Sequence, residues 1–335
     1  MNNPILSIVI PTVQYTKYLD ETIESCLDLN LSINIEVIVS VNNESIESYN
    51  QSKYFQNSNI IWKCLETIPV NMADSMNRAI SFATADWLFV LSDDDLILDG
   101  FLDGIDIDKL STNSLYATRI NIINNNNEVQ RENPAYSKLR YSKEEALNLF
   151  FDKKFHNHIS LFLFNKKLFY KIKKFQLMGY PNGYYMDTVF HGKILANCDY
   201  VYTSDKVVFS RRESSTQGSS KFYFEKEIND YFMKIVDSYF EDENFKIEAL
   251  KRFKSKKNFY RYMIQNRFYT EWGKLHKSVY NKSIKKKFEF LYKFFMYWKT
   301  GVRFKMYIIF YLVAWKTKKS IPKAIKISIK KYLGK

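Results

Sequence analysis

The first hundred residues alternate short β-branched runs with stretches in which apolar residues recur every four positions. The short runs predict strands, and the four-residue period predicts helices with one buried face. Two periodic stretches, Leu19–Leu27 and Met72–Ile80, separate the predicted strands, which are Leu6–Ile10, Glu36–Val41, Ile60–Cys64 and Trp87–Leu91. Strands that alternate with helices fold as βαβ units, so the sequence predicts an α/β fold with a mostly parallel, Rossmann-like sheet.

After about residue 115 the pattern loosens into shorter pieces. A helix is predicted to start near Asp187, a turn at Asn124–Asn127, and strands at Leu115–Ile123, Ile159–Phe164 and Val207–Ser210. Beyond Gly218 the chain is typical of almost continuous helix. We therefore predict an α/β domain over residues 1–220 and a helical region over residues 221–335.

The charge is distributed unevenly along the chain. Residues 245–335 carry 26 lysines and arginines against three acids, or +23, whereas residues 1–244 carry −9 of the total charge of +14. A basic excess alone suggests a nucleic-acid partner, but here it belongs to a tail that follows an acidic body. The hydrophobic content of 46% is ample for a packed core and excludes a disordered chain.

The cysteines and the N-terminus bear on the compartment. Cys26, Cys64 and Cys198 include no CxxC pair, which argues against a disulfide framework and a thiolate zinc site. The first apolar run, Ile5–Ile10, is short, follows no basic cluster and stops at Pro11, so it lacks the layout of a secretory signal. Both features favour a reducing cytoplasm.

The segments that follow three of the predicted strands contain most of the candidate binding residues. They are Pro11–Gln14, Asn42–Ser45 and Ser92–Asp95. In open parallel sheets the ligand crevice lies beyond the carboxyl ends of the strands, so these segments are expected to face one site. Adjacent carboxylates such as Asp93, Asp94 and Asp95 repel one another and are costly to desolvate, which favours a divalent cation beside them. The alternative is a solvated acidic turn that caps the next helix.

Four stretches in this order resemble the family 2 glycosyltransferases of the GT-A fold, which build bacterial surface polysaccharides. They are Ser7–Thr12, Glu36–Ser45, Ser75–Ile80 with Ala83 and Ala85–Trp87, and Leu91–Asp95. The resemblance covers about residues 4–215. It departs from the family pattern at Val41, Ser92 and Met186, where the family often has acidic residues.

The resemblance implies a nucleoside-diphosphate-sugar donor and a bound Mg²⁺ or Mn²⁺. Asp94 is the first choice as metal ligand, with Asp93 and Asp95 as alternatives one residue away. The expected nucleotide-sugar site consists of Pro11, Thr12, Gln14, Asn42, Asn43, Arg78, Asp93, Arg211 and Arg212. Tyr15 is a weaker candidate for stacking on the base.

The acceptor hydroxyl needs a group that takes its proton. Asp187, in a stretch that resembles the acidic pair of the family, is the expected base; the alternative is a plain N-cap. Arg211 and Arg212, in a stretch that ends at Gly218, resemble a flexible loop that closes over the donor diphosphate; the alternative is an ordinary basic surface loop. His156 and His158 face the acceptor or are structural histidines.

The segment Lys285–Trp315 interleaves lysine and arginine with aromatic residues. This mixture suits a helix that lies in anionic headgroups, and its longest uncharged run, Met306–Trp315, is too short to cross a bilayer. The alternatives are packing against the body or a second subunit, and RNA. No RNA-binding signature accompanies the tail, so nucleic acid is not expected.

Together these features predict an inverting, metal-dependent glycosyltransferase. The expected acceptor is a lipid-linked glycan at the cytoplasmic face of the membrane, where the enzyme is peripherally bound. One alternative is a non-catalytic membrane- or RNA-binding scaffold with a degenerate enzyme domain. The other is a sugar nucleotidyltransferase, which is disfavoured because Pro11–Gln14 lacks the glycine-rich phosphate loop of that class.

Overall fold

The structure is a computed structural model that describes residues 3–42, 46–64, 71–155, 158–177, 185–213 and 228–266. The chain divides into two compact units. The first comprises Met1–Ser220 and Ser238–Glu248, and the second comprises Lys221–Asp237 and Ala249–Lys335. The first unit holds all of the strands among the described residues.

The main sheet of the first unit has eight strands in the order β3-β2-β1-β4-β10-β6-β11-β9. The four strands predicted in the first hundred residues are confirmed, and β1 pairs in parallel with both β2 and β4. The strands are β1 (Leu6–Thr12), β2 (Ile35–Val41), β3 (Ile60–Cys64), β4 (Trp87–Val90), β6 (Ser114–Ala117), β9 (Arg140–Ser142), β10 (Phe162–Asn165) and β11 (Tyr200–Thr203).

A smaller sheet has the order β5-β12-β7-β8. Its strands are β5 (Leu96–Ile97), β7 (Ile120–Ile123), β8 (Val129–Glu132) and β12 (Phe209–Arg212). The prediction of one strand over Leu115–Ile123 is wrong, because the chain leaves the main sheet after β6 and enters the smaller one at β7. Thr118 makes this bend: its backbone N donates to Leu161 O and its hydroxyl to Ser160 O.

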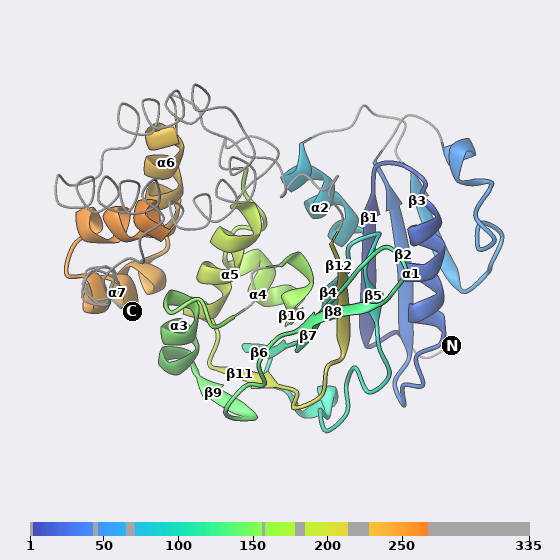
Figure 1. The fold of residues 1–335 in the computed structure, drawn as a ribbon, viewed down its shortest axis with the longest axis horizontal. Helices are drawn as coiled ribbons and strands as arrows, with labels where there is room; N and C mark the ends of the chain where they lie inside the picture. The colour runs from blue at the N-terminus through green and yellow to red at the C-terminus, as the bar shows by residue number, and fades with distance from the viewer. Residues whose placement is uncertain are drawn as a thin grey trace, which may run out of the picture. The chain divides into compact units, whose positions relative to one another are not determined.

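Helices α1 (Lys17–Leu27) and α2 (Met72–Ser81) flank the parallel strands (Figure 1). Leu19, Ile23 and Ile80 of the predicted periodic faces are buried, whereas Met72 is 46% exposed at the first position of its helix. The other elements of this unit are α3 (Lys143–Phe151), α4 (Lys166–Lys171), α5 (Met186–Asn197), and the 3₁₀ turns η1 (Ile46–Tyr49), η2 (Ile107–Lys109) and η3 (Ile159–Leu161).

The direction of α5 follows from the strand order. β10 is antiparallel to both β4 and β6, and β11 is parallel to β6, so β11 runs in the same direction as β4. Because α5 ends just before β11 begins, its N-terminus points toward the edge of the sheet at which β4 ends. This edge is where the parallel strands present the predicted polar segments.

The segment after residue 227 is helical where it is described. It contains α6 (Ile228–Phe240), α7 (Glu243–Phe253) and a helix over residues 256–266. Within the described ranges, no helix combines the length and the apolar character needed to span a bilayer. The basic aromatic segment Lys285–Trp315 lies outside the described residues.

Candidate active site

The acidic triplet follows the carboxyl end of β4, beside the ends of β1 and β2. Leu91 N donates to Val9 O at 2.9 Å, and Asn42 N donates to Thr12 O at 2.8 Å. These bonds align the three strand ends, because parallel strands in register finish at one edge. The Thr12 hydroxyl at the end of β1 donates to Gln14 O at 3.1 Å and is near enough to Asp93 to favour its ionised form. The common edge expected from the sequence is therefore present.

Asp93 lies in a setting that disfavours its charge. Burial, with the carboxylate of Asp94 beside it, raises the pKa of Asp93 to about 6, and the Thr12 hydroxyl opposes this shift. The Thr12 hydroxyl also lies 3.5 Å from the hydroxyl of the fully buried Tyr49. A cation next to Asp93 and Asp94 would favour the ionised carboxylates and so oppose the burial and the repulsion that raise this pKa.

Asp95 is turned into the protein interior. It is fully buried; its Oδ1 accepts a hydrogen bond of 2.8 Å from Arg212 N, and its Oδ2 lies 3.3 Å from His158 Nε2. Burial raises the pKa of Asp95 well above its usual value. Asp95 is therefore excluded as a metal ligand. Asp93 and Asp94, which are both half-buried, remain as the candidates.

His158 is placed by the same contact. Its Nδ1 accepts a hydrogen bond from Ser160 N at 3.3 Å, and its side chain is 13% exposed. The nitrogen that accepts is therefore Nδ1, and Nε2 faces the carboxyl of Asp95. This arrangement supports the structural reading of His158 over the acceptor-facing one; His156 lies outside the described residues.

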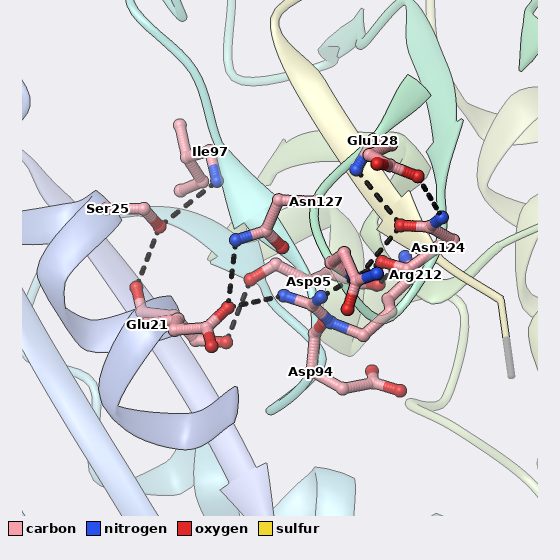
Figure 2. A network of polar contacts seen from close by, with 11 residues as sticks. Glu21, Ser25, Asp94, Asp95, Ile97, Asn124, Asn127, Glu128 and Arg212 are labelled. Carbon is pink, nitrogen blue, oxygen red and sulfur yellow. Dashed lines mark hydrogen bonds and ion pairs between the residues drawn. The ribbon is translucent and has the colours of Figure 1, made fainter. Parts of the chain in front are cut away.

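Arg211 and Arg212 do not lie in a loop but in β12. The guanidinium of Arg212 is buried and donates to Asp94 O, Asn124 O and the carboxylate of Glu21 (Figure 2). The expectation that Arg212 reaches a diphosphate from a flexible loop does not fit this placement. Neighbouring residues of a strand face opposite sides of the sheet, so one of the two arginines must point inward. The sequence alone does not show which one.

The side chain of Arg211 lies near Glu213. Its side chain is 15% exposed, and its Nη1 lies 3.8 Å from Glu213 Oε1. Its charge is close enough to Asp95 to lower the pKa of that carboxyl, against the larger effect of burial. The serines that follow, Ser214 and Ser215, lie outside the described residues.

Arg78 and Asn42 form a second polar pair at this edge. Arg78 Nη2 donates to Asn42 Oδ1, and Asn42 is 4% exposed. Arg78 Nε is buried with no hydrogen-bond partner among the described residues. A buried donor without a partner is costly, so this guanidinium is suited to an anionic or carbonyl oxygen of a ligand.

The remaining nucleotide-site residues differ in exposure. Pro11 and Thr12 are buried at the end of β1, while Gln14 is exposed. The Tyr15 hydroxyl donates to Asp20 Oδ2 at 3.0 Å, and its ring meets Tyr49 edge-on with a centroid distance of 6.3 Å. Asn43 lies outside the described residues.

Asp187 is the second residue of α5. The N-cap is Tyr185, which has the left-handed φ of 71°, so the alternative that Asp187 is a plain N-cap is wrong. Asp187 Oδ1 accepts a hydrogen bond from Thr188 N at 2.7 Å, and the side chain is half-buried. Asp187 thus lies in the first turn of α5, and a carboxylate is one of the side chains that can act as a general base.

The sequence did not point to Glu21, Tyr18 or Asn124. Glu21 lies in the first turns of α1 and reads in the sequence as an ordinary helical acid. Its carboxylate is 2.7 Å from Arg212 Nη2, and the Tyr18 ring centroid is 4.2 Å from Arg212 Cζ. No local signal marks these residues, because their common partner Arg212 is 191 positions from Glu21 and 88 positions from Asn124.

Among the described residues, no group of three or more histidine, cysteine, aspartate or glutamate side chains forms a ready metal cage. Asp93 and Asp94 offer adjacent carboxylate oxygens, which suit a hard cation that completes its coordination with water and phosphate. A magnesium-type ion bound through one or two carboxylates plus a ligand's phosphates fits this donor set.

The mostly parallel sheet carries Asp93, Asp94 and Asp95, here called the acidic loop, and the Arg78–Asn42 pair at one carboxyl edge. Open α/β sheets hold their ligands at this edge. Residues 7–173 match the model of Glycosyl transferase family 2. The chain belongs to this family, and its fold is the GT-A fold with a helical C-terminal region. The curated protein sequences contain no significant match to the chain.

Solved structures of Staphylococcus aureus TarS share the fold. The structure of TarS residues 1–349 with UDP-GlcNAc has a TM-score of 0.53 and 15% identity, over 74% of this chain and 73% of that chain. The structure of the same fragment with UDP has a TM-score of 0.53 and 11% identity, over 86% and 78%. A longer TarS chain has a TM-score of 0.50 and 14% identity, and 40% of its length is covered.

Proposed function

We propose that this chain is an inverting glycosyltransferase that moves a sugar from a nucleoside-diphosphate donor to a hydroxyl group of a glycan. The observation that carries the proposal is the pair of carboxylates, Asp93 and Asp94, at the sheet edge where Arg78 has a buried Nε with no hydrogen-bond partner among the described residues. The complexes of TarS with UDP-GlcNAc and UDP support a donor of this class.

Asp94 and Asp93 would hold Mg²⁺ or Mn²⁺. Such an ion neutralises the charge that develops on a leaving diphosphate. Arg78 and Asn42 bind the donor at the same edge, and Arg211 is a further cation beside the acidic loop. The Thr12 hydroxyl, at the end of β1, favours the ionised form of the Asp93 carboxyl.

Asp187 accepts the proton of the acceptor hydroxyl. A hydroxyl group is a weak nucleophile until a positioned base removes its proton. The carboxylate is supported by the N-terminal end of α5, which points toward the edge where β4 ends. Attack of the activated oxygen on the anomeric carbon, from the side opposite the leaving diphosphate, inverts that carbon.

The acceptor is a growing lipid-linked glycan of a cell-surface polysaccharide. The basic, aromatic segment Lys285–Trp315 favours a peripheral position on an anionic membrane at the cytoplasmic side. A non-catalytic scaffold remains the second candidate, since Val41, Ser92 and Met186 stand where the family often has acidic residues.

The donor class is tested with the full chain and a panel of nucleoside diphosphates and their sugars, with and without Mn²⁺. We expect one sugar nucleotide to raise the midpoint of thermal unfolding, more so with Mn²⁺, because a ligand that binds only the native state stabilises it. Metal-dependent release of the nucleoside diphosphate excludes the scaffold. A panel with no shift and no release contradicts the proposed function.

The roles of the two carboxylates are tested by Asp94→Asn and Asp187→Asn. Each change should lower sugar transfer at least about a hundredfold, because a general base or a metal ligand is lost, and leave the unfolding transition in place. Asp86→Asn is the matched control, since Asp86 is exposed just before β4 at the opposite edge of the sheet. Full transfer activity in either variant refutes the role of that residue.

A further inference from the structure

Arg212 is the largest of the fully buried side chains among the described residues. Burying a guanidinium is costly unless its donors are met by good partners, so its contacts show what the fold requires of it. It belongs to β12, which pairs with β5 and β7 in the smaller sheet. Its partners lie in three other parts of the first unit.

Two of its contacts hold adjacent residues of the acidic loop. Arg212 Nε donates to Asp94 O at 2.9 Å, and Arg212 N donates to Asp95 Oδ1 at 2.8 Å. One residue of β12 thus fixes both the backbone of Asp94 and the side chain of Asp95. The loop between β4 and β5 cannot rotate about Asp94 without breaking one of these bonds.

The remaining donors anchor the guanidinium itself. Nη2 bonds Glu21 Oε2 of α1 at 2.7 Å, and Nη1 bonds Asn124 O at 3.1 Å. Asn127 Nδ2, from the turn that Asn124 begins, also donates to Glu21 Oε2 at 3.2 Å. Figure 2 shows Glu21 and Arg212 facing each other, with Asn124, Asn127 and the acidic loop around them. The guanidinium is therefore held from α1 and from the β7–β8 turn.

Helix α1 holds the loop a second time. The Thr22 hydroxyl donates to Asp95 O at 2.8 Å. The backbone of the loop is thus fastened at Asp94 O and at Asp95 O by groups on separate elements. The side chains of Asp93 and Asp94 themselves are half-buried.

We propose that Arg212 is a positioning residue, which fixes the Asp94 carbonyl and the Asp95 carboxylate so that the Asp93 and Asp94 carboxylates are presented to a divalent cation and a donor diphosphate. The inference rests on the proposed function of the acidic loop. Groups that hold metal ligands in place affect metal affinity without touching the metal. Arg212 acts through the loop and contacts no reacting atom.

The test is Arg212→Lys in the full chain. Lysine keeps a positive charge near Glu21 but has no N–H partway along its side chain, so it cannot reproduce the bond from Nε to Asp94 O. Binding of Mn²⁺ in the presence of UDP is followed by electron paramagnetic resonance. We expect the Mn²⁺ affinity to fall about tenfold or more. The free energy of unfolding is measured on the same samples.

Arg119→Lys is the matched control. Arg119 donates to the carbonyls of Asn133 and Asp205 and lies 3.5 Å from Glu132, as a part-buried arginine that contacts no residue of the acidic loop. We expect this variant to lose stability by a similar amount and to bind Mn²⁺ like the wild type. The inference is overturned if both variants lose Mn²⁺ affinity in proportion to their loss of stability.

Two further outcomes are decisive. Wild-type Mn²⁺ affinity in Arg212→Lys overturns the positioning role while leaving the proposed function intact. If Arg212→Lys does not fold, Glu21→Gln replaces it, because this change weakens the anchor of the guanidinium; a lower Mn²⁺ affinity supports the inference, and wild-type affinity overturns it. Absence of Mn²⁺ binding in the wild-type chain overturns the metal-dependent function and the inference together.

Discussion

At the scale of single residues, the acidic loop separates three carboxylates that look equivalent in the sequence. Asp95 is fully buried against Arg212 and His158, whereas Asp93 and Asp94 keep partial access to solvent. The difference arises because β12 and His158 arrive from distant parts of the chain and cover one side of the loop. The three side chains are therefore expected to respond differently to pH and to substitution.

The pKa of Asp93 predicts how the stability of the metal-free protein depends on pH. Its pKa is about 6 in the folded state and near 3.9 in an unfolded chain, so the native protein takes up this proton first as the pH falls. Between about pH 4 and pH 6 the native state binds more protons, and the contribution of Asp93 to stability therefore rises as the pH falls through this window and is lost above it.

Asp93→Asn should remove this dependence. Urea unfolding of the metal-free chain at pH 4.5 and pH 7.5 should show the variant gaining stability over the wild type at pH 7.5 and little difference at pH 4.5. Asp86→Asn, at an exposed position, serves as the control. An unchanged difference between the two pH values in Asp93→Asn contradicts the assigned pKa.

The cysteines give a second prediction at this scale. Burial raises the pKa of both Cys26 and Cys198 to about 12, and Cys64 is half-buried at the end of β3. Because the thiolate is the reactive form, alkylation at pH 8 should label Cys64 in the native protein and the other two thiols only in urea. Mass spectrometry of the labelled peptides checks this. Native labelling of Cys26 or Cys198 shows that the surrounding core opens.

At the scale of elements, α5 packs tightly against residues Ser238–Glu248 of its own unit. A Cβ atom at Gly192 would lie 2.5 Å from Tyr239 Cε1 and 2.9 Å from Phe245 Cε2. Tyr239 and Phe245 are fully buried and stack on each other at a centroid distance of 4.3 Å. The Tyr239 hydroxyl donates to Thr188 O at 2.7 Å, near the N-terminus of α5 and close in sequence to Asp187.

Gly192→Ala should therefore destabilise the protein. Alanine in place of glycine ordinarily favours a helix by about 1 kcal/mol, but here overpacking against two fixed rings is expected to cost about 1–3 kcal/mol. Equilibrium unfolding in urea measures the difference. Equal or higher stability in the variant contradicts the close approach of Tyr239 to α5.

The strand predictions also belong to this scale. The strands before residue 91 were predicted well because each is a short apolar run within a regular βαβ pattern. The run Leu115–Ile123 was predicted as one strand and forms two, because Thr118 binds the backbone of residues 160 and 161 and redirects the chain. Apolar runs show that a segment is buried but not which sheet receives it.

At the scale of the whole molecule, the charge is divided between an acidic body and a basic tail, with +23 in residues 245–335. Such a division suits a chain whose tail meets an anionic surface while the body binds its substrates. Attraction of this kind is screened by salt and depends on the lipid charge.

The full chain should cosediment at low salt with vesicles that contain anionic phospholipid. It should dissociate from them at high salt and should not bind neutral vesicles. Replacing Lys285, Lys286 and Lys287 with glutamate should weaken the association. The matched control is glutamate at Lys171, Lys173 and Lys174, three exposed lysines of the first unit. Equal losses in the two triple variants contradict a specific role of the tail.

The sequence by itself determined the parallel strands, the acidic loop at their carboxyl edge and the basic tail, since each is written in consecutive residues. Only the tertiary structure decided that Asp95 faces inward, that Arg212 supports the loop and that Asp187 follows the N-cap of α5. The bond from Arg212 N to Asp95 Oδ1 joins residues 117 positions apart. Contacts at that separation depend on how the two sheets pack, and local periodicity carries no information about it.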